Sequence, residues 1–228
     1  MFIPSSELKK LYSASGSFFN LRINSHVIKC RNFLDIYQKG SKISSINPEA
    51  FVIMMNPGNS KPILGKKQGE SNEIPEFDIN SPDLLFQISN NSPRKAKPDS
   101  TQYQVMRLME HYGWRYVRVL NLSDIRNTKS REFAREYKKL DNTIHSIFLG
   151  KREDERKFLC SGIEQKPVIV AWGVLPGLKE LAVSAKEKLP SHIRGIQGKK
   201  PYLYYHPLPR GKKTAKSWLM DFINGGQY

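Results

Sequence analysis

Residues 50–58 read AFVIMMNPG, and this stretch is the strongest indication of the fold. A run of apolar residues that ends in Asn-Pro-Gly is typical of a buried strand closed by a tight turn. Three later stretches have the same character: YVRVLN at 116–121, PVIVAWG at 167–173 and PYLYYHP at 201–207. We therefore predict four buried strands.

Helical patterns separate these strands. Asp99-Ser100-Thr101 follows Pro98 and Gly113 comes after Tyr112, which predicts a helix over residues 99–112. Further helices are predicted over residues 130–148, 152–161, 178–189 and 214–224. Apolar strands that alternate with helices favour an α/β protein. We expect a three-layer α/β/α sandwich with a central, mainly parallel four-stranded sheet.

The chain is expected to form a single domain over residues 1–228, because no internal repeat and no linker is visible. Residues 1–46 are interpreted as an N-terminal extension, in which residues 17–38 fit either a short helix or a hairpin. Residues 59–98 are rich in Pro, Ser, Asn, Lys and Gly. They are interpreted as a long loop region with a short element around residues 84–88.

The charge of the chain indicates a polyanionic partner. Its 37 Lys and Arg residues exceed its 21 Asp and Glu residues, which gives 37 − 21 = +16. Between Lys188 and Met220 there is no acidic residue, and tyrosines and a tryptophan are interleaved with the basic ones. This pattern favours nucleic acid. A generally basic surface and attraction to anionic lipid are the alternatives.

Other sequence features exclude several classes of protein. Cys30 and Cys160 fit no zinc spacing and are interpreted as buried free thiols. The histidines are scattered and no phosphate-binding glycine loop is present, so we expect neither a metal nor a cofactor. The apolar runs at 51–55 and 168–172 are too short for a membrane span, and no secretory leader is visible. We expect a cytoplasmic monomer.

Polar residues stand where the predicted strands end. Asn56-Pro57-Gly58 follows the first strand, Asn121 closes the second, and His206 ends the fourth. Because the carboxyl ends of parallel strands meet at one edge of a sheet, two amides and a histidine are expected to lie together. Each has a plainer interpretation, since Asn56, Gly58 and Asn121 also suit turns and His206 could be a packed side chain.

These residues together resemble the uracil-DNA glycosylase superfamily. MMNPGNS at 54–60 is similar to the first motif of its mismatch-specific branch, and VRVLNLSDIR at 117–126 to the segment whose Asn reads the flipped base. VIVAWG at 168–173 resembles the strand before the last motif. YYHPLPRGKK at 204–213 resembles the His-Pro-x-Pro motif that begins the minor-groove loop. The matches are short but ordered, and they do not cover residues 1–50 or 59–98, as in a divergent branch.

The resemblance implies a monofunctional DNA glycosylase that flips a pyrimidine out of double-stranded DNA and excises it, leaving an abasic site. His206 would donate a hydrogen bond to O2 of the leaving base, and Asn56 would position the attacking water. Asn121 would read the base edge, with Pro57 and Gly58 beside the base. No metal or cofactor takes part.

The resemblance also implies the residues that hold the DNA. Leu208 or Arg210 would act as the wedge in the duplex, and Arg210 departs from the Leu that the family often has there. Lys212 and Lys213 would contact phosphates.

Gly58 indicates the kind of base. The uracil-strict branch has a bulky Tyr in the corresponding place, and glycine leaves room for a substituent at the 5-position. The resulting candidate substrate is glucosylated hydroxymethylcytosine in phage DNA, which implies a role in phage defence. The alternatives are an ordinary uracil or mismatch repair glycosylase, a non-catalytic nucleic-acid-binding module, and a nucleotide or nucleoside hydrolase.

Overall fold

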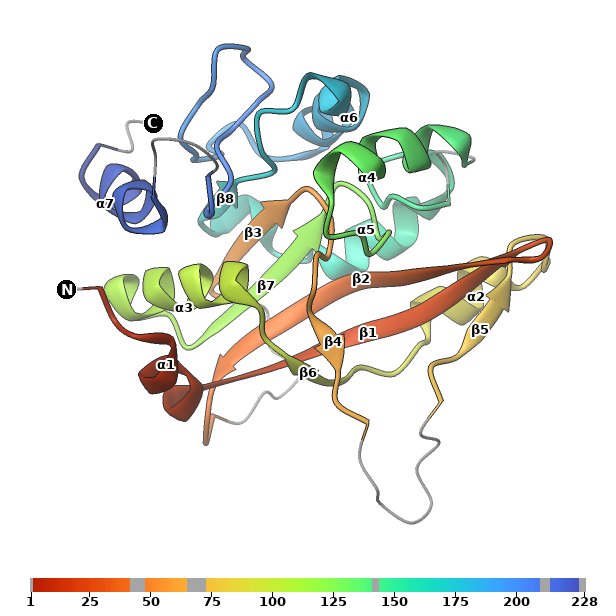
Figure 1. The fold of residues 1–228 in the computed structure, drawn as a ribbon, viewed down its shortest axis with the longest axis horizontal. Helices are drawn as coiled ribbons and strands as arrows, with labels where there is room; N and C mark the ends of the chain where they lie inside the picture. Colours follow the sequence, from red (N-terminus) through yellow and green to blue (C-terminus); the bar gives the residue numbers. More distant parts are fainter. Residues whose placement is uncertain (1, 42–47, 65–72, 141–143, 210–213, 226–228) are drawn as a thin grey trace.

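A computed structural model describes residues 2–41, 48–64, 73–140, 144–209 and 214–225. Within these residues eight strands form one mixed, mostly antiparallel sheet with the order β4-β6-β1-β2-β7-β3-β8, and β5 pairs with β1 (Figure 1). The strands are β1 Tyr12–Ile23, β2 His26–Gln38, β3 Ala50–Met54, β4 Lys61–Pro62, β5 Glu76–Asp78, β6 Arg94–Lys97, β7 Tyr116–Asn121 and β8 Val168–Val170.

Helices pack on both faces of this sheet. The α-helices are α1 Ser5–Leu11, α2 Leu84–Ser89, α3 Ser100–Tyr112, α4 Ser130–Glu136, α5 Glu153–Leu159, α6 Lys179–Lys188 and α7 Ala215–Gly225. Short 3₁₀ helices span Tyr137–Lys139, Gly150–Arg152, Ile163–Gln165 and Pro176–Leu178.

The expected sandwich around a mainly parallel four-stranded sheet is wrong, because the sheet has eight strands and is mostly antiparallel. Three of the four predicted strands exist as β3, β7 and β8, and these three do pair in parallel. The difference comes from β2, which pairs antiparallel with β7 and brings β1 and its neighbours into the same sheet.

The predicted fourth strand at 201–207 does not form. Tyr204 makes only isolated bridges, to Gly173 and to Gln197. Pro201 and Pro207 lack the N–H that a sheet ladder needs, so neither end of this segment can donate to a ladder. It remains beside the carboxyl end of β8 all the same, since the Gly173 N–H donates to the Tyr204 carbonyl at 2.7 Å.

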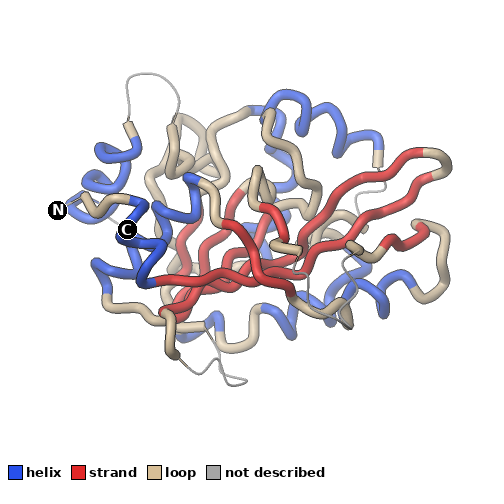
Figure 2. The backbone as a smooth tube through the Cα atoms, turned by 60° about the horizontal axis from the view of Figure 1, so that its bottom comes forward, coloured by secondary structure: helices blue, strands red, loops and turns tan. Residues whose placement is uncertain are grey.

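Residues 17–38, whose sequence fits either a short helix or a hairpin, form a hairpin. Strands β1 and β2 are the two longest and turn at Asn24, whose φ of 53° is the left-handed conformation that Asn tolerates. Their far end extends beyond the rest of the sheet and is covered by β5 and α2 (Figures 1 and 2). Residues that were expected to be an extension therefore supply the middle of the sheet.

The region 59–98 contains several elements instead of being one long loop. Its short element around residues 84–88 is confirmed as α2. Strands β4 and β6 pair with each other, β6 pairs with β1, and β5 adds to the far end of β1. These short strands are polar, so their sequence carries little strand pattern.

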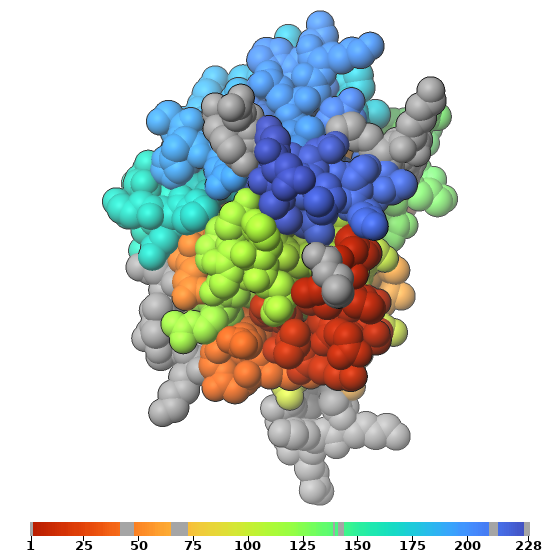
Figure 3. Space-filling view, turned by 90° about the vertical axis from the view of Figure 1, so that its left-hand side faces the viewer, coloured from red at the N-terminus to blue at the C-terminus, as the bar shows by residue number. Residues whose placement is uncertain are grey.

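Two hydrophobic cores lie on opposite faces of the sheet. One packs α4, α5 and α6 against residues such as Phe51 and Leu120. The other packs α1, α3 and α7 against residues such as Val52 and Val119. Figure 3 shows the N-terminal segment, α3 and α7 side by side on the outer surface of this second layer.

Helix α3 begins and ends as predicted. The Asp99 carboxylate accepts from the Thr101 and Gln102 backbone N–H groups, and the Gln102 side chain accepts from the Asp99 N–H, which completes a capping box. Gly113, with φ of 72°, forms the left-handed cap at the other end. By contrast, the helix predicted over 130–148 ends early, at Glu136, and a 3₁₀ turn over Tyr137–Lys139 follows it. The His145 carbonyl accepts from the Asp124 N–H outside any helix.

Other expectations concern thiols and membranes. Cys30 and Cys160 are confirmed as buried free thiols. The helices of the described residues are all too short or too polar to cross a bilayer.

Candidate active site at the carboxyl end of the parallel strands

A cavity of about 600 Å³ lies where the chain leaves β3 and β8. This volume is within the range of roughly 300–1,000 Å³ that is usual for small-molecule sites. Its walls come from the turn after β3, the first turn of α3, the segment after β8 and residues 205–209. Edges at which parallel strands end are the usual place for a ligand in an α/β sheet.

The cavity gathers five of the predicted site residues: Asn56, Pro57, Gly58, His206 and Leu208. Asn121 is not among the residues that line it. Arg210, Lys212 and Lys213 lie outside the described residues. The turn at Asn56 and the loop at His206, which are far apart in the sequence, are thus brought to one site.

The Asn56 side chain is held in one orientation. Its Nδ2 donates to the Ile125 carbonyl at 3.1 Å and to the Asn127 carbonyl at 2.6 Å. Two carbonyls can accept only from the nitrogen of the amide, so the Oδ1 position is fixed as well. Within the described residues Oδ1 forms no hydrogen bond, which leaves it as an acceptor for a water or a ligand.

Gly58 occupies a position that only glycine adopts easily. Its φ is 63°, and a Cβ there would lie 3.2 Å from Asp99 Oδ2. The same carboxylate oxygen accepts from the Asn59 N–H at 3.2 Å, which ties the turn to the start of α3. The shape of the turn therefore favours glycine at position 58. The missing side chain also leaves space in the cavity.

His206 lies in an irregular segment that is fixed on both sides. The Trp218 indole donates to the Tyr205 carbonyl at 3.0 Å, and the Gln104 Nε2 donates to the Pro207 carbonyl at 3.1 Å. Gln104 is fully buried on α3 and also donates to the Ala215 carbonyl at 2.6 Å. The histidine is therefore placed by α3 and α7 instead of by a strand.

The hydrogen bond at Nδ1 decides the tautomer of His206. The Leu208 backbone N–H donates to Nδ1 at 3.1 Å. An Nδ1 that accepts a hydrogen bond carries no proton, so the neutral imidazole has its proton on Nε2. Nε2 is thus the hydrogen-bond donor of this side chain.

Asn121 lies under the floor of the cavity. It pairs with Met54 in the parallel register, and Met54 lines the cavity. Asn121 is 1% exposed, and neither of its amide atoms has a hydrogen-bond partner among the described residues. A buried amide without partners costs free energy, so such groups are rare unless a ligand or water satisfies them.

Arg31 is a site residue that sequence reasoning missed. It pairs with Phe18 across β1 and β2, is 1% exposed and lines the cavity. Its Nε and Nη1 have no partner among the described residues. Burial lowers its pKa to about 9, and Asp99 opposes that shift. Nothing in the local sequence KCRN distinguished this arginine from an exposed one.

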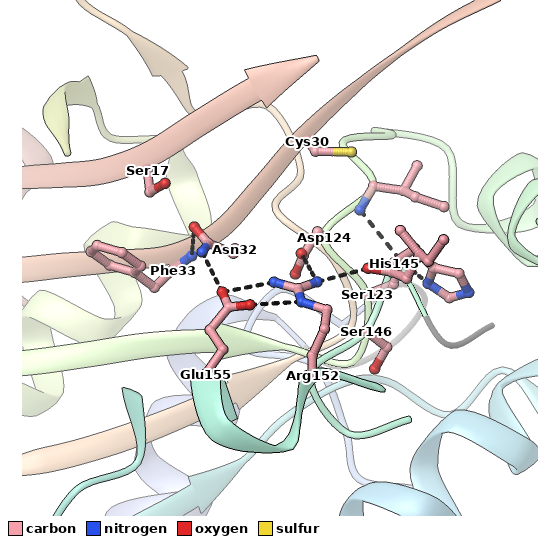
Figure 4. Close-up of polar contacts among 12 residues, drawn as sticks. Ser17, Cys30, Asn32, Phe33, Ser123, Asp124, His145, Ser146, Arg152 and Glu155 are labelled. Carbon is pink, nitrogen blue, oxygen red and sulfur yellow. Dashed lines mark hydrogen bonds and ion pairs between the residues drawn. The ribbon is translucent and has the colours of Figure 1, made fainter. Parts of the chain in front are cut away.

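A buried ion-pair network supports the loop that follows β7 (Figure 4). The Arg152 guanidinium pairs with Asp124 and, at 2.8 Å, with Glu155. Asn32 donates to Glu155 at 2.7 Å, and the Asp124 carbonyl accepts from the Arg31 N–H at 2.9 Å. The network therefore anchors both the loop whose carbonyls hold Asn56 and the strand that carries Arg31.

In this network the single guanidinium of Arg152 pairs with the carboxylates of both Asp124 and Glu155. Burial lowers the pKa of Arg152, but Asp124 and Glu155 outweigh burial and hold that pKa above its ordinary value. The pKa of Asp124 is raised to about 7 in all: burial is the main cause, Arg152 opposes the rise, Glu155 adds to it and Arg31 opposes it. Asp124 Oδ1 also has no hydrogen-bond partner among the described residues, so the charge of Asp124 is incompletely compensated.

We expect the free energy of unfolding to fall as the pH rises toward 8. The folded pKa of Asp124 of about 7 lies above the value of about 3.9 for an unfolded Asp, so the folded state holds the proton more tightly. The stabilisation is complete below the unfolded pKa and is lost as the pH rises through the folded pKa. Between pH 5 and 8 this amounts to about 3 kcal/mol.

Urea unfolding of the wild type and of Asp124→Asn at several pH values measures this effect. The variant has no carboxyl to titrate, so its stability relative to the wild type should improve across that pH range. Parallel curves for the two proteins would show that Asp124 is ionised throughout.

The described residues contain no group of three or more His, Cys, Asp and Glu side chains that could hold a metal ion. Comparison of the chain with protein-family models, with curated proteins and with solved structures gives no match. A functional assignment therefore rests on the cavity and its residues.

Proposed function

We propose that the protein is a monofunctional DNA glycosylase that excises a flipped pyrimidine. The observation that carries the proposal is that two side chains suited to this reaction line the same cavity. The neutral His206 imidazole carries its proton on Nε2, the Asn56 amide oxygen is fixed in orientation, and both side chains line the cavity together with Gly58. A donor can stabilise the charge on a departing base, and an acceptor can orient an attacking water, so the two groups suit hydrolysis of an N-glycosidic bond.

The proposed reaction breaks the bond between C1′ of the sugar and the base nitrogen. The bonding electrons go to the base, and the His206 Nε2–H stabilises the charge that develops on O2. The Asn56 Oδ1 accepts from a water and directs its oxygen to C1′. An amide is a poor general base, so the water proton is lost late and the departing base takes up a proton.

Binding of duplex DNA is supported by charge and by the position of Leu208. The net charge is +16, and Leu208 lies at the cavity next to His206. A wedge at this position would fill the gap that a flipped base leaves. Arg210, which follows in the sequence, is the alternative wedge, and Lys212 and Lys213 are proposed to contact phosphates.

A pyrimidine with a 5-substituent is the proposed substrate. The cavity of about 600 Å³ is large for a bare base, and Gly58 places no side chain in it. Ser100, Thr101 and Thr128 add hydroxyl groups to its lining. Glucosylated hydroxymethylcytosine, as in phage DNA, is the candidate. Asn121 would read the base edge through the floor beside Met54.

An abasic-site assay tests the proposal. Duplexes with uracil, thymine opposite guanine, hydroxymethylcytosine and glucosylated hydroxymethylcytosine are incubated with the protein and then cleaved with alkali. We expect strand breaks on the 5-modified duplexes and few on uracil, because the cavity holds a substituent that uracil lacks.

The same assay separates the alternatives. Breaks on uracil alone would indicate an ordinary repair glycosylase. Salt-dependent DNA binding without breaks on any duplex would contradict the glycosylase and favour a non-catalytic binding module. Release of base from free nucleosides, with no action on duplexes, would indicate a nucleoside hydrolase.

A further inference from the structure

Arg31 differs from the other buried arginines of the protein. Arg107 donates to the Ile3 carbonyl at 2.8 Å and to Gln104 Oε1 at 2.7 Å, and Arg152 pairs with Asp124 and Glu155. The Arg31 side chain forms no hydrogen bond with the described residues, although it is just as buried. An unpaired buried charge destabilises a protein, so it points to a partner that is not part of the chain.

The charges that act on Arg31 belong to groups that form no hydrogen bond with its side chain. The acidic side chain that acts most on it is Asp99, whose carboxylate already accepts from the backbone N–H groups of Asn59, Thr101 and Gln102. Asp124 also raises the pKa of Arg31, and Arg126 lowers it, but neither provides a hydrogen-bond partner for Nε or Nη1 among the described residues. The guanidinium therefore keeps donors that nothing in the described part of the chain uses.

Arg31 and Gly58 line the same cavity, together with Asp99. Asp99 Oδ2 would be 3.2 Å from a Cβ on Gly58, and the Asp99 charge raises the pKa of Arg31. A substituent that enters past Gly58 therefore shares the cavity with the Arg31 guanidinium. Guanidinium groups bind oxygen acceptors, and most strongly a carboxylate or phosphate.

We propose that Arg31 binds oxygen acceptors of the ligand in this cavity, and an anionic oxygen best of all. The proposal rests on the proposed glycosylase function, because it takes those oxygens to belong to the 5-substituent of the base. Arg31 then selects pyrimidines with an oxygen-bearing 5-substituent over unsubstituted ones. It is a specificity-determining residue and takes no part in bond cleavage.

Binding of free bases by calorimetry tests this without any excision step. The probes are 5-carboxyuracil, 5-hydroxymethyluracil and uracil, which share one ring and differ only at the 5-position. We expect wild-type affinity to decrease in that order. Arg31→Met should weaken 5-carboxyuracil binding by about 10- to 100-fold, as for a lost hydrogen bond to a charged group, and leave uracil binding unchanged.

The control variant is Arg115→Gln, which removes one positive charge from an exposed side chain that pairs only loosely with Glu49 at 3.8 Å. It should bind all three bases as the wild type does. Equal affinity of the wild type for the three bases, or an unchanged preference in Arg31→Met, would overturn the proposal.

A second measurement checks that Arg31→Met is folded and that Arg31 has no structural partner. Because methionine replaces an unpaired charge by an apolar chain, the ligand-free variant should melt at a higher temperature than the wild type. A lower melting temperature would contradict the proposal, since it would show that Arg31 is paired within the protein. Failure of excision in the abasic-site assay with the base preference intact would overturn the proposed function alone.

Discussion

Replacement of His206 by alanine is expected to slow base release by about 10²- to 10³-fold, the usual effect of removing one donor to a developing oxyanion. The reason is the tautomer, because the Leu208 N–H holds Nδ1 as an acceptor and leaves the proton on Nε2. Single-turnover excision on a duplex that the wild type cleaves measures the effect. DNA affinity should change little, since the imidazole lies in the cavity.

The matched control is His192→Ala. His192 is exposed, and its Nε2 contacts the Lys166 carbonyl at 3.0 Å. This variant should excise at the wild-type rate. If His206→Ala retained full activity while binding DNA normally, the assignment of the leaving-group role to His206 would be wrong.

Arg152→Met is expected to cost about 3–5 kcal/mol of stability, the usual penalty for breaking a fully buried ion pair. Removal of the guanidinium leaves Asp124 and Glu155 buried and uncompensated. Chemical denaturation monitored by tryptophan fluorescence measures the loss. The pairing of Asp124 with Arg152 also holds the loop behind Asn56, so base release should fall in the folded fraction.

Two further variants separate burial from charge. Arg156→Met, in α5 one turn after Arg152, breaks a pair in which Glu153 is 41% exposed, so it should cost no more than about 1 kcal/mol. Adding Glu155→Gln to Arg152→Met removes one uncompensated charge and should restore part of the loss. Similar losses for Arg152→Met and Arg156→Met would contradict the role given to the network.

The parts of the fold with strong sequence patterns could be predicted. Strands β3 and β8 are continuous apolar runs, β7 is mostly apolar, and α3 has a capping box and a terminal glycine. The sheet as a whole could not be predicted, because its other strands lack such patterns. In β1 and β2 buried residues do not alternate regularly with exposed ones, since both faces of the hairpin are covered along much of its length.

The candidate site was partly predictable for a related reason. Asn56 and His206 were expected at one edge of the sheet, and both line the cavity, although no strand carries His206 there. Its place depends on side chains such as Gln104 that bind its backbone neighbours, and no local pattern reports such contacts. Arg31 was missed because its importance lies in the partners it lacks, which only the three-dimensional arrangement reveals.

Helix α3 joins the two halves of the candidate site. Its cap residue Asp99 binds the turn that follows Asn56, and Gln104, little more than one turn later, binds the backbone beside His206. The separation between the water-binding amide and the imidazole is thus set by the first turns of α3. Sequence changes elsewhere in the sheet can alter its strands without altering this spacing, whereas a shift of α3 along its axis would displace both groups together.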